Sequence, residues 1–311
     1  MEGKRAAITG GAGFIGSNLA EELATDNTVI IIDDLSTGRE ENIASLLQKD
    51  NVEFIQGSIL DLKLLQKSFR GIDFVFHLAA LPSVPRSIED PRATNEVNIT
   101  GTLNVLLAAR DNNIRKVVYA SSSSVYGDTP VLPKSEDMSP NPQSPYALTK
   151  LVGEYYCHVF HQIYRLPTIC LRYFNVYGPR QDPNSQYAAV IPRFIARVLR
   201  GKPPIIYGDG EQTRDFTYIK DAIQANLIAA EDSATGIFNI GRGERISINN
   251  LAKTILNIMG KDLQPVYEPP LPGDIRHSLA DLSKTRRMGY NPSYDLEAGL
   301  RQTIGCVKSL L

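Results

Sequence analysis

Two side chains near the middle of the chain have the types and the spacing for acid/base chemistry. Tyr146 and Lys150 are four residues apart in the segment SPYALTK, so a helix would project both from one face. Ser144 would cap this helix and Pro145 would occupy its first turn. A nearby ammonium and the positive end of the helix dipole would stabilise a phenolate, whose ordinary pKa is about 10. We therefore predict that Tyr146 is a general base.

Four consecutive serines, Ser121 to Ser124, follow an apolar run in the segment YASSSSVYG. In open α/β sheets, ligands bind outside the carboxyl edge of the strands. Small hydroxyls at that edge can donate to a substrate alcohol or carbonyl. A serine run alone is usually a solvated loop, and a Tyr/Lys pair alone is usually a surface contact. Their coincidence with a third motif, a glycine-rich turn, favours the catalytic interpretation.

The glycine-rich turn is the segment TGGAGFIGS at residues 9–17, between a predicted strand and a helix that begins at Phe14. Gly10, Gly13 and Gly16 would allow a tight turn, a close approach of the backbone to a pyrophosphate, and close packing of the helix on the strand. The helix N-terminus would add free N–H groups and a positive dipole end. The alternative, a glycine turn without a ligand, fits this context less well. We predict a dinucleotide ligand.

Asp33 ends the second predicted strand, about 20 residues beyond the turn. A carboxylate there can accept hydrogen bonds from ribose hydroxyls and would repel a 2′-phosphate, which favours NAD over NADP. Arg39 lies close enough in sequence to weaken this preference, and a turn cap is the alternative role for Asp33. The oxidised nicotinamide ring of NAD would also favour the phenolate form of Tyr146.

The elements that must position these residues alternate regularly in the first half of the chain. Short β-branched runs bounded by Gly or Asp predict strands at residues 5–9, 28–33, 52–56, 73–79, 116–121 and 168–172. Helical patterns lie between them, which is typical of βαβ units and of a parallel sheet covered on both faces. The fold class predicted is α/β, with a doubly wound parallel sheet of the Rossmann kind.

After residue 172 this alternation stops, in a segment rich in Pro, Gly and Asn (YFNVYGPRQDPNSQY). Beyond it we expect only short strands, at residues 204–207, 236–240 and 263–267, between helices. The prediction is a dinucleotide-binding domain at residues 1–174 and a smaller α/β lobe for the substrate at residues 175–311, with some crossover of the chain between them. A cleft rather than a flexible linker would separate the two.

Composition excludes several classes of protein. In 311 residues, 33 Lys and Arg oppose 34 Asp and Glu, so no net field draws the chain to nucleic acid or to an anionic membrane. A hydrophobic content of 42% and a charged content of 22% are those of a globular protein. No apolar stretch reaches the roughly 18 residues of a membrane span, and no signal-peptide pattern is present at the N-terminus. We expect a cytoplasmic protein without nucleic-acid or membrane partners.

The cysteines and histidines indicate neither a disulfide framework nor a metal site. Three cysteines at long spacings form no paired-cysteine motif. Cys157, His158 and His161 lie on a predicted helix without a complementary carboxylate cluster, so we expect no metal there. His77 ends a strand and is expected to be a hydrogen-bonded core residue.

Taken together, the motifs TGGAGFIG, Asp33, HLAA (residues 77–80), the Ser122 region and the Tyr146/Lys150 pair resemble the extended short-chain dehydrogenase/reductases that modify nucleotide sugars. The resemblance covers essentially the whole chain. It is closest to the UDP-sugar 4-epimerases, and within them to the UDP-N-acetylglucosamine 4-epimerase branch. The segments that carry this closer likeness are SVPRSIEDP, LRYFNVYGPRQDP, AAVIPRF, GDGEQTRDFTYI and PGDIRHSLAD.

The resemblance implies roles for individual residues. Ser122, with Ser123 as a second candidate, would bind the reacting sugar hydroxyl, Tyr146 would be the acid/base, and Lys150 would hold the nicotinamide ribose and lower the pKa of Tyr146. The cofactor NAD would be bound by Gly10, Gly13, Phe14, Ile15, Gly16, Asp33, Asp34, Ser36, Thr37, Gly38, Ser58, Ile59, Leu78, Ala79, Ala80, Asn98, Tyr146 and Lys150. The UDP-sugar would be bound by Ser83, Ser122, Ser123, Asn175, Ala189, Val190, Tyr207, Arg214, Asp274, Arg276 and Ser278.

Within this set, Tyr207 would lie against the uracil and Arg214 would bind the diphosphate, for which a planar guanidinium is well suited. Ser278 matches the position that limits the space beside the sugar. A small residue there admits a 2-acetamido group, so we expect UDP-GlcNAc and UDP-GalNAc to be accepted together with UDP-Glc and UDP-Gal.

The chain departs from the family pattern at two positions. Leu271 stands where these epimerases commonly have a second diphosphate-binding Arg, and Arg276 is the candidate substitute. Ser58 stands where an adenine-binding Asp is common, and its hydroxyl would bind the adenine edge less strongly than a carboxylate.

The resemblance implies a C4 epimerisation in which Tyr146 removes the C4 hydroxyl proton, a hydride passes to tightly bound NAD, and the 4-keto sugar turns over before the hydride returns. UDP-glucuronate is the alternative substrate, because a four-serine run also occurs in UDP-glucuronate 4-epimerases. Nucleotide-sugar dehydratases carry an Asp-Glu pair where this chain has Ser123-Ser124, which disfavours that chemistry. A non-catalytic NAD-binding regulator is disfavoured because the Tyr/Lys pair is intact. Helices at residues 92–111 and 145–164 would form a homodimer interface.

Overall fold

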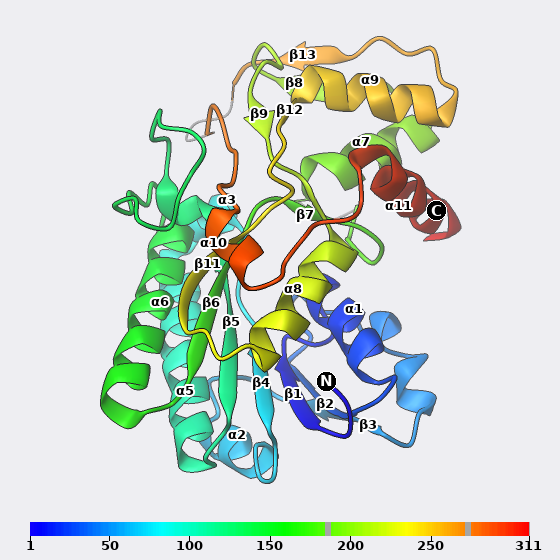
Figure 1. Cartoon of the computed structure of the whole chain (residues 1–311). Helices are drawn as coiled ribbons and strands as arrows, with labels where there is room; N and C mark the ends of the chain where they lie inside the picture. Colours follow the sequence, from blue (N-terminus) through cyan, green and yellow to red (C-terminus); the bar gives the residue numbers. More distant parts are fainter. Residues whose placement is uncertain (184–187, 271–274, 311) are drawn as a thin grey trace.

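A seven-stranded sheet with helices on both faces forms the larger part of the molecule (Figure 1). The structure is a computed structural model that describes residues 1–183, 188–270 and 275–310. All neighbouring strands of this sheet are parallel, in the order β11-β6-β5-β4-β1-β2-β3. They are β1 (Arg5–Thr9), β2 (Thr28–Asp33), β3 (Val52–Gln56), β4 (Phe74–His77), β5 (Lys116–Ser122), β6 (Thr168–Tyr173) and β11 (Gly236–Ile240). The predicted doubly wound parallel fold is confirmed.

Strand β11 corrects one prediction. Residues 236–240 were expected in the smaller lobe, but they pair with β6 at the edge of the main sheet. The chain returns to the sheet through α8 (Ile219–Glu231), which packs against β5, β6 and α1. A five-residue apolar run can extend any sheet that offers a free edge, and the sequence pattern alone does not say which one.

The helices of the first lobe follow the strands closely. The helix predicted at Phe14 begins there, and the segment expected as one helix from residue 92 to 111 contains a π-helical stretch between its two α-helical parts. The elements are α1 (Phe14–Leu23), α2 (Leu62–Ser68), α3 (Val84–Glu89), α4 (Pro91–Asn95), the π-helical η3 (Glu96–Thr100), α5 (Gly101–Asp111) and α6 (Pro145–Tyr164), with 3-10 turns η1 (Glu40–Asn42), η2 (Leu46–Gln48) and η4 (Ser123–Tyr126). Between β1 and β4 the strand order reverses, which is where ligands of such sheets bind.

The remaining elements lie above the carboxyl edge of the sheet in Figure 1. The helices are α7 (Val190–Leu199), α9 (Ile248–Met259), α10 (Ser283–Arg287) and α11 (Leu296–Leu310). The strands form three pairs: β7 (Val176–Tyr177) with β10 (Thr217–Tyr218), β8 (Ile205–Tyr207) with β13 (Val266–Glu268), and β9 (Thr213–Arg214) with β12 (Ile246–Ser247). The predicted strands at residues 204–207 and 263–267 correspond to β8 and β13.

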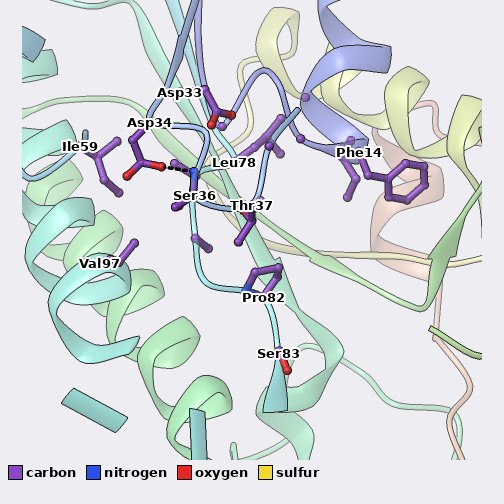
Figure 2. A pocket seen from close by; sticks show the side chains of 18 of the residues that line it. Phe14, Asp33, Asp34, Ser36, Thr37, Ile59, Leu78, Pro82, Ser83 and Val97 are labelled. Carbon is purple, nitrogen blue, oxygen red and sulfur yellow. Dashed lines mark hydrogen bonds between the residues drawn. The ribbon is translucent and has the colours of Figure 1, made fainter. Parts of the chain in front are cut away.

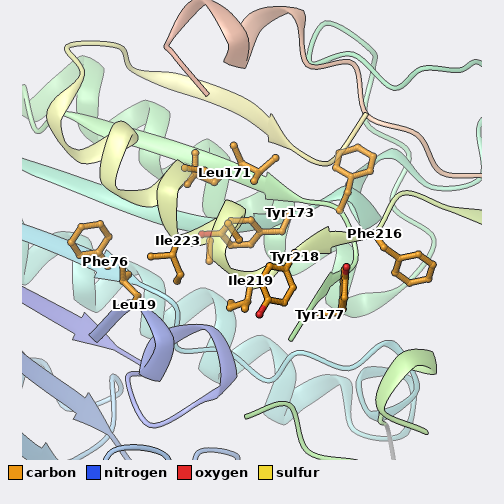
Figure 3. Packing of buried hydrophobic residues seen from close by; sticks show 14 of the residues in the cluster. Leu19, Phe76, Leu171, Tyr173, Tyr177, Phe216, Tyr218, Ile219 and Ile223 are labelled. Atoms are coloured by element: carbon orange, nitrogen blue, oxygen red, sulfur yellow. The ribbon is translucent and has the colours of Figure 1, made fainter. Parts of the chain in front are cut away.

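One continuous hydrophobic cluster joins the two lobes (Figure 3). Leu19 of α1, Phe76 of β4 and Leu171 of β6 are fully buried in it, together with residues of α8 such as Ile223 and with Tyr218 from the second lobe. Because this core is continuous, it fixes the main sheet and the later elements relative to each other. Within the described residues, no helix is both long and apolar enough to cross a membrane.

Helix α6 packs against strand β5 with a glycine, Gly153, at the contact. A Cβ on Gly153 would lie 2.2 Å from the Tyr119 hydroxyl oxygen, and Tyr119 itself is 1% exposed. That hydroxyl lies 3.5 Å from the backbone carbonyl of Lys150. Gly153 therefore sets the distance between β5 and the helix that carries Tyr146 and Lys150.

We expect Gly153→Ala to lower the free energy of unfolding by about 1–3 kcal/mol, because the new methyl group overpacks the contact with Tyr119. Gly305→Ala in α11 is the matched control, since a Cβ there meets nothing within 4 Å. That substitution should stabilise the protein by about 0.5–1 kcal/mol through the better helix propensity of Ala. Denaturant unfolding of both variants measures the difference, and equal stabilisation by both would contradict the close contact.

Candidate active site

The glycine turn between β1 and α1 is shaped by backbone contacts that side chains would block. Gly10 has a φ of +73°, and a Cβ there would lie 2.6 Å from the backbone nitrogen of Ala79. A Cβ on Gly16 would lie 2.2 Å from the carbonyl oxygen of Gly10. Gly13 is the N-cap of α1, and no side chain caps this helix. The turn therefore leaves the positive end of α1 open to an anionic ligand.

Asp33 is 7% exposed and holds the glycine turn in place. One carboxylate oxygen accepts from the backbone N–H of Ala12 at 3.0 Å, and the other accepts from that of Leu35 at 2.9 Å. Burial raises the pKa of this carboxyl, and the backbone hydrogen bonds oppose that rise. Asp33 therefore does cap the turn, but each of its carboxylate oxygens has a second lone pair that could accept from a ribose hydroxyl. Arg39, which weakened the preference for NAD, forms an ion pair with Asp182.

A cavity of about 700 Å³ is lined both by this turn and by Tyr146. Figure 2 shows part of its wall, including Asp33, Ser36 and Ser83. Most of the predicted cofactor residues line it: Gly10, Gly13, Phe14, Ile15, Gly16, Asp33, Asp34, Ser36, Thr37, Gly38, Ile59, Leu78, Ala79, Ala80, Tyr146 and Lys150. Of the predicted substrate residues, Ser83 and Ala189 also line it. The wall has the glycine turn and the polar groups that a dinucleotide requires.

Two predicted cofactor residues do not line this cavity. Asn98 is 1% exposed and bonds the backbone N–H and carbonyl of Leu81 and the hydroxyl of Thr149. The hydroxyl of Ser58 accepts from the backbone N–H of Leu60 at 3.3 Å. Asn98 thus ties the loop after β4 to α6 and supports the cavity from behind.

Sequence reasoning also missed several residues that line the cavity, among them Pro82, Arg86, Val97, Ser121, Tyr173, Gln181 and Asp182. Arg86, Gln181 and Asp182 belong to quoted motifs, SVPRSIEDP and LRYFNVYGPRQDP, which were the available signal. Pro82 directly precedes the predicted Ser83, and Ser121 directly precedes Ser122.

Helix α6 begins as predicted and carries Tyr146 and Lys150, the predicted acid/base pair, which both line the cavity. The Ser144 hydroxyl accepts from the backbone N–H of Ala147, and Pro145 is in the first turn. Lys150 is 4% exposed, and its Nζ donates to the Ala120 carbonyl at 2.8 Å. This Nζ lies 6.0 Å from the ring centroid of Tyr146. Ser122 is close enough to the Tyr146 phenol to affect its pKa.

The protonation of this group is set mainly by burial. Burial raises the pKa of Tyr146, and the hydrogen bond with Ser122 opposes the rise. Burial also lowers the pKa of Lys150 to about 8, against the opposing effects of Cys157 and Glu154. The predicted lowering of the Tyr146 pKa by Lys150 alone is therefore not seen. It stays a prediction for the complex with a positively charged ring.

His77 is a core residue, as expected. It is 1% exposed, with its ring nitrogens 2.7 Å and 2.9 Å from the hydroxyls of Thr9 and Thr102. Burial, together with the charge of Lys150, lowers the pKa of this imidazole to about 3. In the described ranges, no cluster of three or more His, Cys, Asp and Glu side chains is arranged to hold a metal ion.

The other predicted substrate residues lie outside the lining of this cavity, and several are held by neighbours. Asn175 has a φ of +34° and donates through Nδ2 to the Asp215 carbonyl at 3.0 Å. The guanidinium of Arg193 lies 5.2 Å from the ring centroid of Tyr207. Those outside the lining are Ser122, Ser123, Asn175, Val190, Tyr207, Arg214, Arg276 and Ser278. Asp274 and Leu271 fall outside the described residues.

Arg276, the candidate substitute for the missing diphosphate ligand, forms a bidentate ion pair with Asp209, with both N···O distances 2.8 Å. Hydrogen bonds from this guanidinium, foremost, and from a backbone N–H lower the pKa of Asp209 to about 2. The pair is half-exposed. Arg276 would therefore have to exchange Asp209 for a diphosphate.

A residue without a predicted role, Asp215, organises the segments around Arg214 and Ser278. It is fully buried and accepts backbone N–H bonds from Arg242, Gly243 and Ala280. Burial raises its pKa to about 6 against the effect of these bonds. Its place in the TRDF segment, next to Arg214, was the only sequence signal.

Comparison with known proteins adds to this geometry. A family model described as "NAD dependent epimerase/dehydratase family" matches residues 6–241. The UDP-glucose 4-epimerase of Mycolicibacterium smegmatis is 40% identical over 306 residues, which cover 96% of this chain and 97% of that protein.

Two solved structures are similar over nearly their whole length. The UDP-N-acetylglucosamine 4-epimerase from Methanobrevibacter ruminantium M1, in complex with UDP-N-acetylmuramic acid, has a TM-score of 0.97 at 44% identity and covers 100% of both chains. The UDP-glucuronic acid 4-epimerase from Bacillus cereus, in complex with UDP-glucuronic acid and NAD, has a TM-score of 0.91 at 38% identity and covers 99% of this chain and 100% of that one. The family resemblance inferred from the motifs is confirmed.

We expect Gly10→Ala to lower the affinity for NAD by about tenfold or more, because the Cβ would push the turn away from Ala79 and displace the pyrophosphate site. Gly3→Ala is the matched control, since Gly3 also has a positive φ, of +62°, but no atom within 4 Å of a Cβ. The measurement is the NAD released per chain when the purified proteins are denatured. Equal NAD content in both variants and the parent would remove the turn from the cofactor site.

Proposed function

Since this chain belongs to the NAD dependent epimerase/dehydratase family, an enzyme family whose cofactor is NAD, we propose that it inverts C4 of UDP-hexoses. The proposed substrates are the pairs UDP-GlcNAc and UDP-GalNAc, and UDP-Glc and UDP-Gal. The observation that carries the proposal is the pair Tyr146 and Lys150, which lines the same cavity as the glycine turn. Ser122 is a neighbour of the Tyr146 phenol outside this lining.

The residues that would hold NAD follow from the cavity wall. The open N-terminus of α1 suits the pyrophosphate, Asp33 has lone pairs for the adenosine ribose, and Lys150 is within reach of the nicotinamide ribose. When bound, NAD supplies the acceptor and donor of a hydride at C4 of the sugar. We propose that the binding is tight and that residues 1–174 form this cofactor domain.

Tyr146 would act as the base in the first half-reaction and as the acid in the second. It would take the proton of the C4 hydroxyl as the C4–H bond breaks, and return it to the same oxygen once the hydride has been delivered to the opposite face of the 4-keto sugar. The Ser122 hydroxyl, a neighbour of the phenol, would orient the C4 oxygen. Lys150, buried beneath Tyr146, would bring the positive charge that favours the phenolate.

The second lobe, residues 175–311, would bind the nucleotide rather than the sugar. Tyr207 would stack on the uracil, and Arg214 and Arg276 would bind the diphosphate. An enzyme that places its binding energy in the remote nucleotide leaves the sugar ring free to turn over between the two half-reactions. Asp215 supports this role, because it anchors both the Arg214 and the Ser278 segments.

Ser278 is the basis for including N-acetylated sugars. Its side chain is small and 8% exposed, and its backbone N–H donates to the Thr213 carbonyl at 3.1 Å, next to Arg214. UDP-glucuronate is the second candidate substrate, supported by the likeness to the Bacillus cereus enzyme. Dehydratase chemistry lacks support, because Ser123 and Ser124 stand where it would need an acid and a base.

We also propose a homodimer formed through α5 and α6. The outer face of α6 exposes Leu148, Tyr155, Val159 and Ile163, at 50%, 56%, 41% and 66%. Apolar side chains at this spacing form one stripe along a helix. A continuous stripe of this kind on the surface of a monomer is typical of a helix-packed interface.

The purified protein should convert UDP-GlcNAc to UDP-GalNAc without added reductant, as followed by chromatography of the product isomers, with UDP-glucuronate tested separately. Tyr146→Phe should lower kcat by about 100-fold or more, because the general base is lost. Tyr164→Phe, at an exposed position on the same helix, is the control and should leave kcat unchanged. A Tyr146→Phe variant that turns over at the parent rate would refute Tyr146 as the base.

Replacing Ser278 with Tyr should abolish turnover of UDP-GlcNAc while that of UDP-Glc persists, because the ring would fill the space of the 2-acetamido group. A loss of about 1.4 kcal/mol of transition-state binding lowers kcat/KM tenfold, and steric exclusion should exceed that. The UDP-Glc rate serves as the internal control for folding. If both substrates lose activity in equal proportion, Ser278 does not select the sugar.

A further inference from the structure

A buried ion pair lies near Lys150 and has no role in the reaction proposed above. Glu154 of α6 and Arg172 of β6 are each 1% exposed. Their contact is bidentate, with Nε–Oε1 at 2.8 Å and Nη2–Oε2 at 2.7 Å. The guanidinium also lies 4.6 Å from the ring centroid of Tyr126. Both charges are thus withdrawn from water and depend on each other.

Glu154 also accepts a hydrogen bond from the Ser121 hydroxyl, which is buried at the end of β5. Ser121 directly precedes Ser122, the neighbour of Tyr146 that lowers the pKa of its phenol. On α6, Glu154 follows Lys150 by four residues and Tyr146 by eight, so all three lie along one face of the helix. One carboxylate therefore links the helix that carries the base to the strand that carries the serine.

We propose that Glu154 is a positioning residue of the active site: through Ser121 and Arg172 it holds β5, β6 and α6 in the register at which the Ser122 hydroxyl meets the Tyr146 phenol. The proposal deepens the epimerase function proposed above and rests on it. Glu154 acts on the substrate only through Ser121, Ser122 and Lys150.

The hydrogen bonds of Glu154 with Ser121 and Arg172 do more than fill space in the core. Apolar side chains of similar volume can replace a buried ion pair without loss of stability, so folding alone does not require one. Its hydrogen bonds are directional, however, and fix the relative position of the groups they join. Catalysis responds to such positions steeply, since a misplacement of about 1 Å can cost about 100-fold in rate.

The linkage also sets the charge environment of Lys150. The titratable groups around Lys150 are His77 on β4, Tyr119 on β5, and Tyr146, Glu154 and Cys157 on its own helix, with Arg172 of β6 bonded to Glu154. Burial lowers the pKa of Lys150 to about 8, and Glu154 opposes that shift. Removing the carboxylate charge would thus let the Lys150 pKa fall further and leave Arg172 as an unpaired positive charge nearby.

Ser121→Ala tests the linkage with the ion pair intact. We expect kcat for UDP-GlcNAc to fall by about tenfold with KM within twofold of the parent, because the strand loses its anchor while the residues proposed to bind UDP are unchanged. Thr168→Val is the matched control: the Thr168 hydroxyl of β6 also donates across to α6, to the Cys157 carbonyl at 2.8 Å, in the same buried layer. This variant should lose stability by a similar amount and keep kcat within about twofold.

Glu154→Gln tests the charge. Activity should fall at high pH as Lys150 loses its proton, and in this variant that basic limb of the kcat profile should move to lower pH, because the Lys150 pKa is lower. Ser121→Ala, which keeps the carboxylate, should leave the limb in place.

The proposal is overturned if Ser121→Ala and Thr168→Val lose kcat equally, or if both keep it. It is also overturned if Glu154→Gln folds and its basic limb does not move. Should Glu154→Gln not fold, the Ser121→Ala and Thr168→Val pair decides the question. A parent protein that does not epimerise any UDP-hexose would instead refute the proposed function, so the two failures are distinguishable.

Discussion

The burial of a lysine ammonium against the end of strand β5 is the constraint on which the active site depends. An isolated buried ammonium is costly, so Lys150 needs a fixed acceptor, and the Ala120 carbonyl at 2.8 Å supplies one. That bond forms only if α6 lies close to the strand, which requires a residue without a side chain at the contact. Gly153 meets this requirement, because any Cβ would collide with Tyr119. The position of α6 therefore determines both the hydrogen bond of the Lys150 ammonium and the location of Tyr146.

Buried polar side chains hold the loops at the same edge of the sheet. Their hydrogen-bond partners are distant in the sequence, so the sequence alone does not reveal this role. Asp33 braces the glycine turn from the carboxyl end of β2, Asn98 braces the loop after β4, and Asp215 braces the segments of the second lobe. Each is nearly or fully buried and bonds backbone groups from at least one distant segment. Buried polar groups must be paired, so these contacts are directional and hold the loops of the cleft in one arrangement. The proposed cofactor and substrate sites are thus supported by residues that need not touch a ligand.

Local patterns in the sequence predicted the sheet and the start of α6 well, because both depend on short-range physics. Six strands of the main sheet and the Ser144-Pro145 start of α6 follow from β-branched runs and capping chemistry. The sequence did not predict that residues 236–240 pair with β6 in the main sheet, because strand pairing is decided by tertiary contacts. Two-residue strands such as β7 lack any periodicity to detect. Similarly, the family motifs predicted the glycine turn and the lining of the cavity, but not that Asn98 supports the cavity from behind or that Arg276 is paired with Asp209.

The protonation states of the site are consistent with a reaction that conserves its proton. Burial favours the neutral form of both Tyr146 and Lys150, since it raises the pKa of the first and lowers that of the second to about 8. In the proposed epimerisation the proton leaves and rejoins the same C4 oxygen, so exchange with bulk water brings no benefit. A general base in such a site needs to ionise only while the reacting groups are in place, and a desolvated phenol beside a fixed ammonium has that property. The buried contact between α6 and β5 therefore fixes the positions of Tyr146 and Lys150 and also keeps the proton of Tyr146 from exchanging with bulk water.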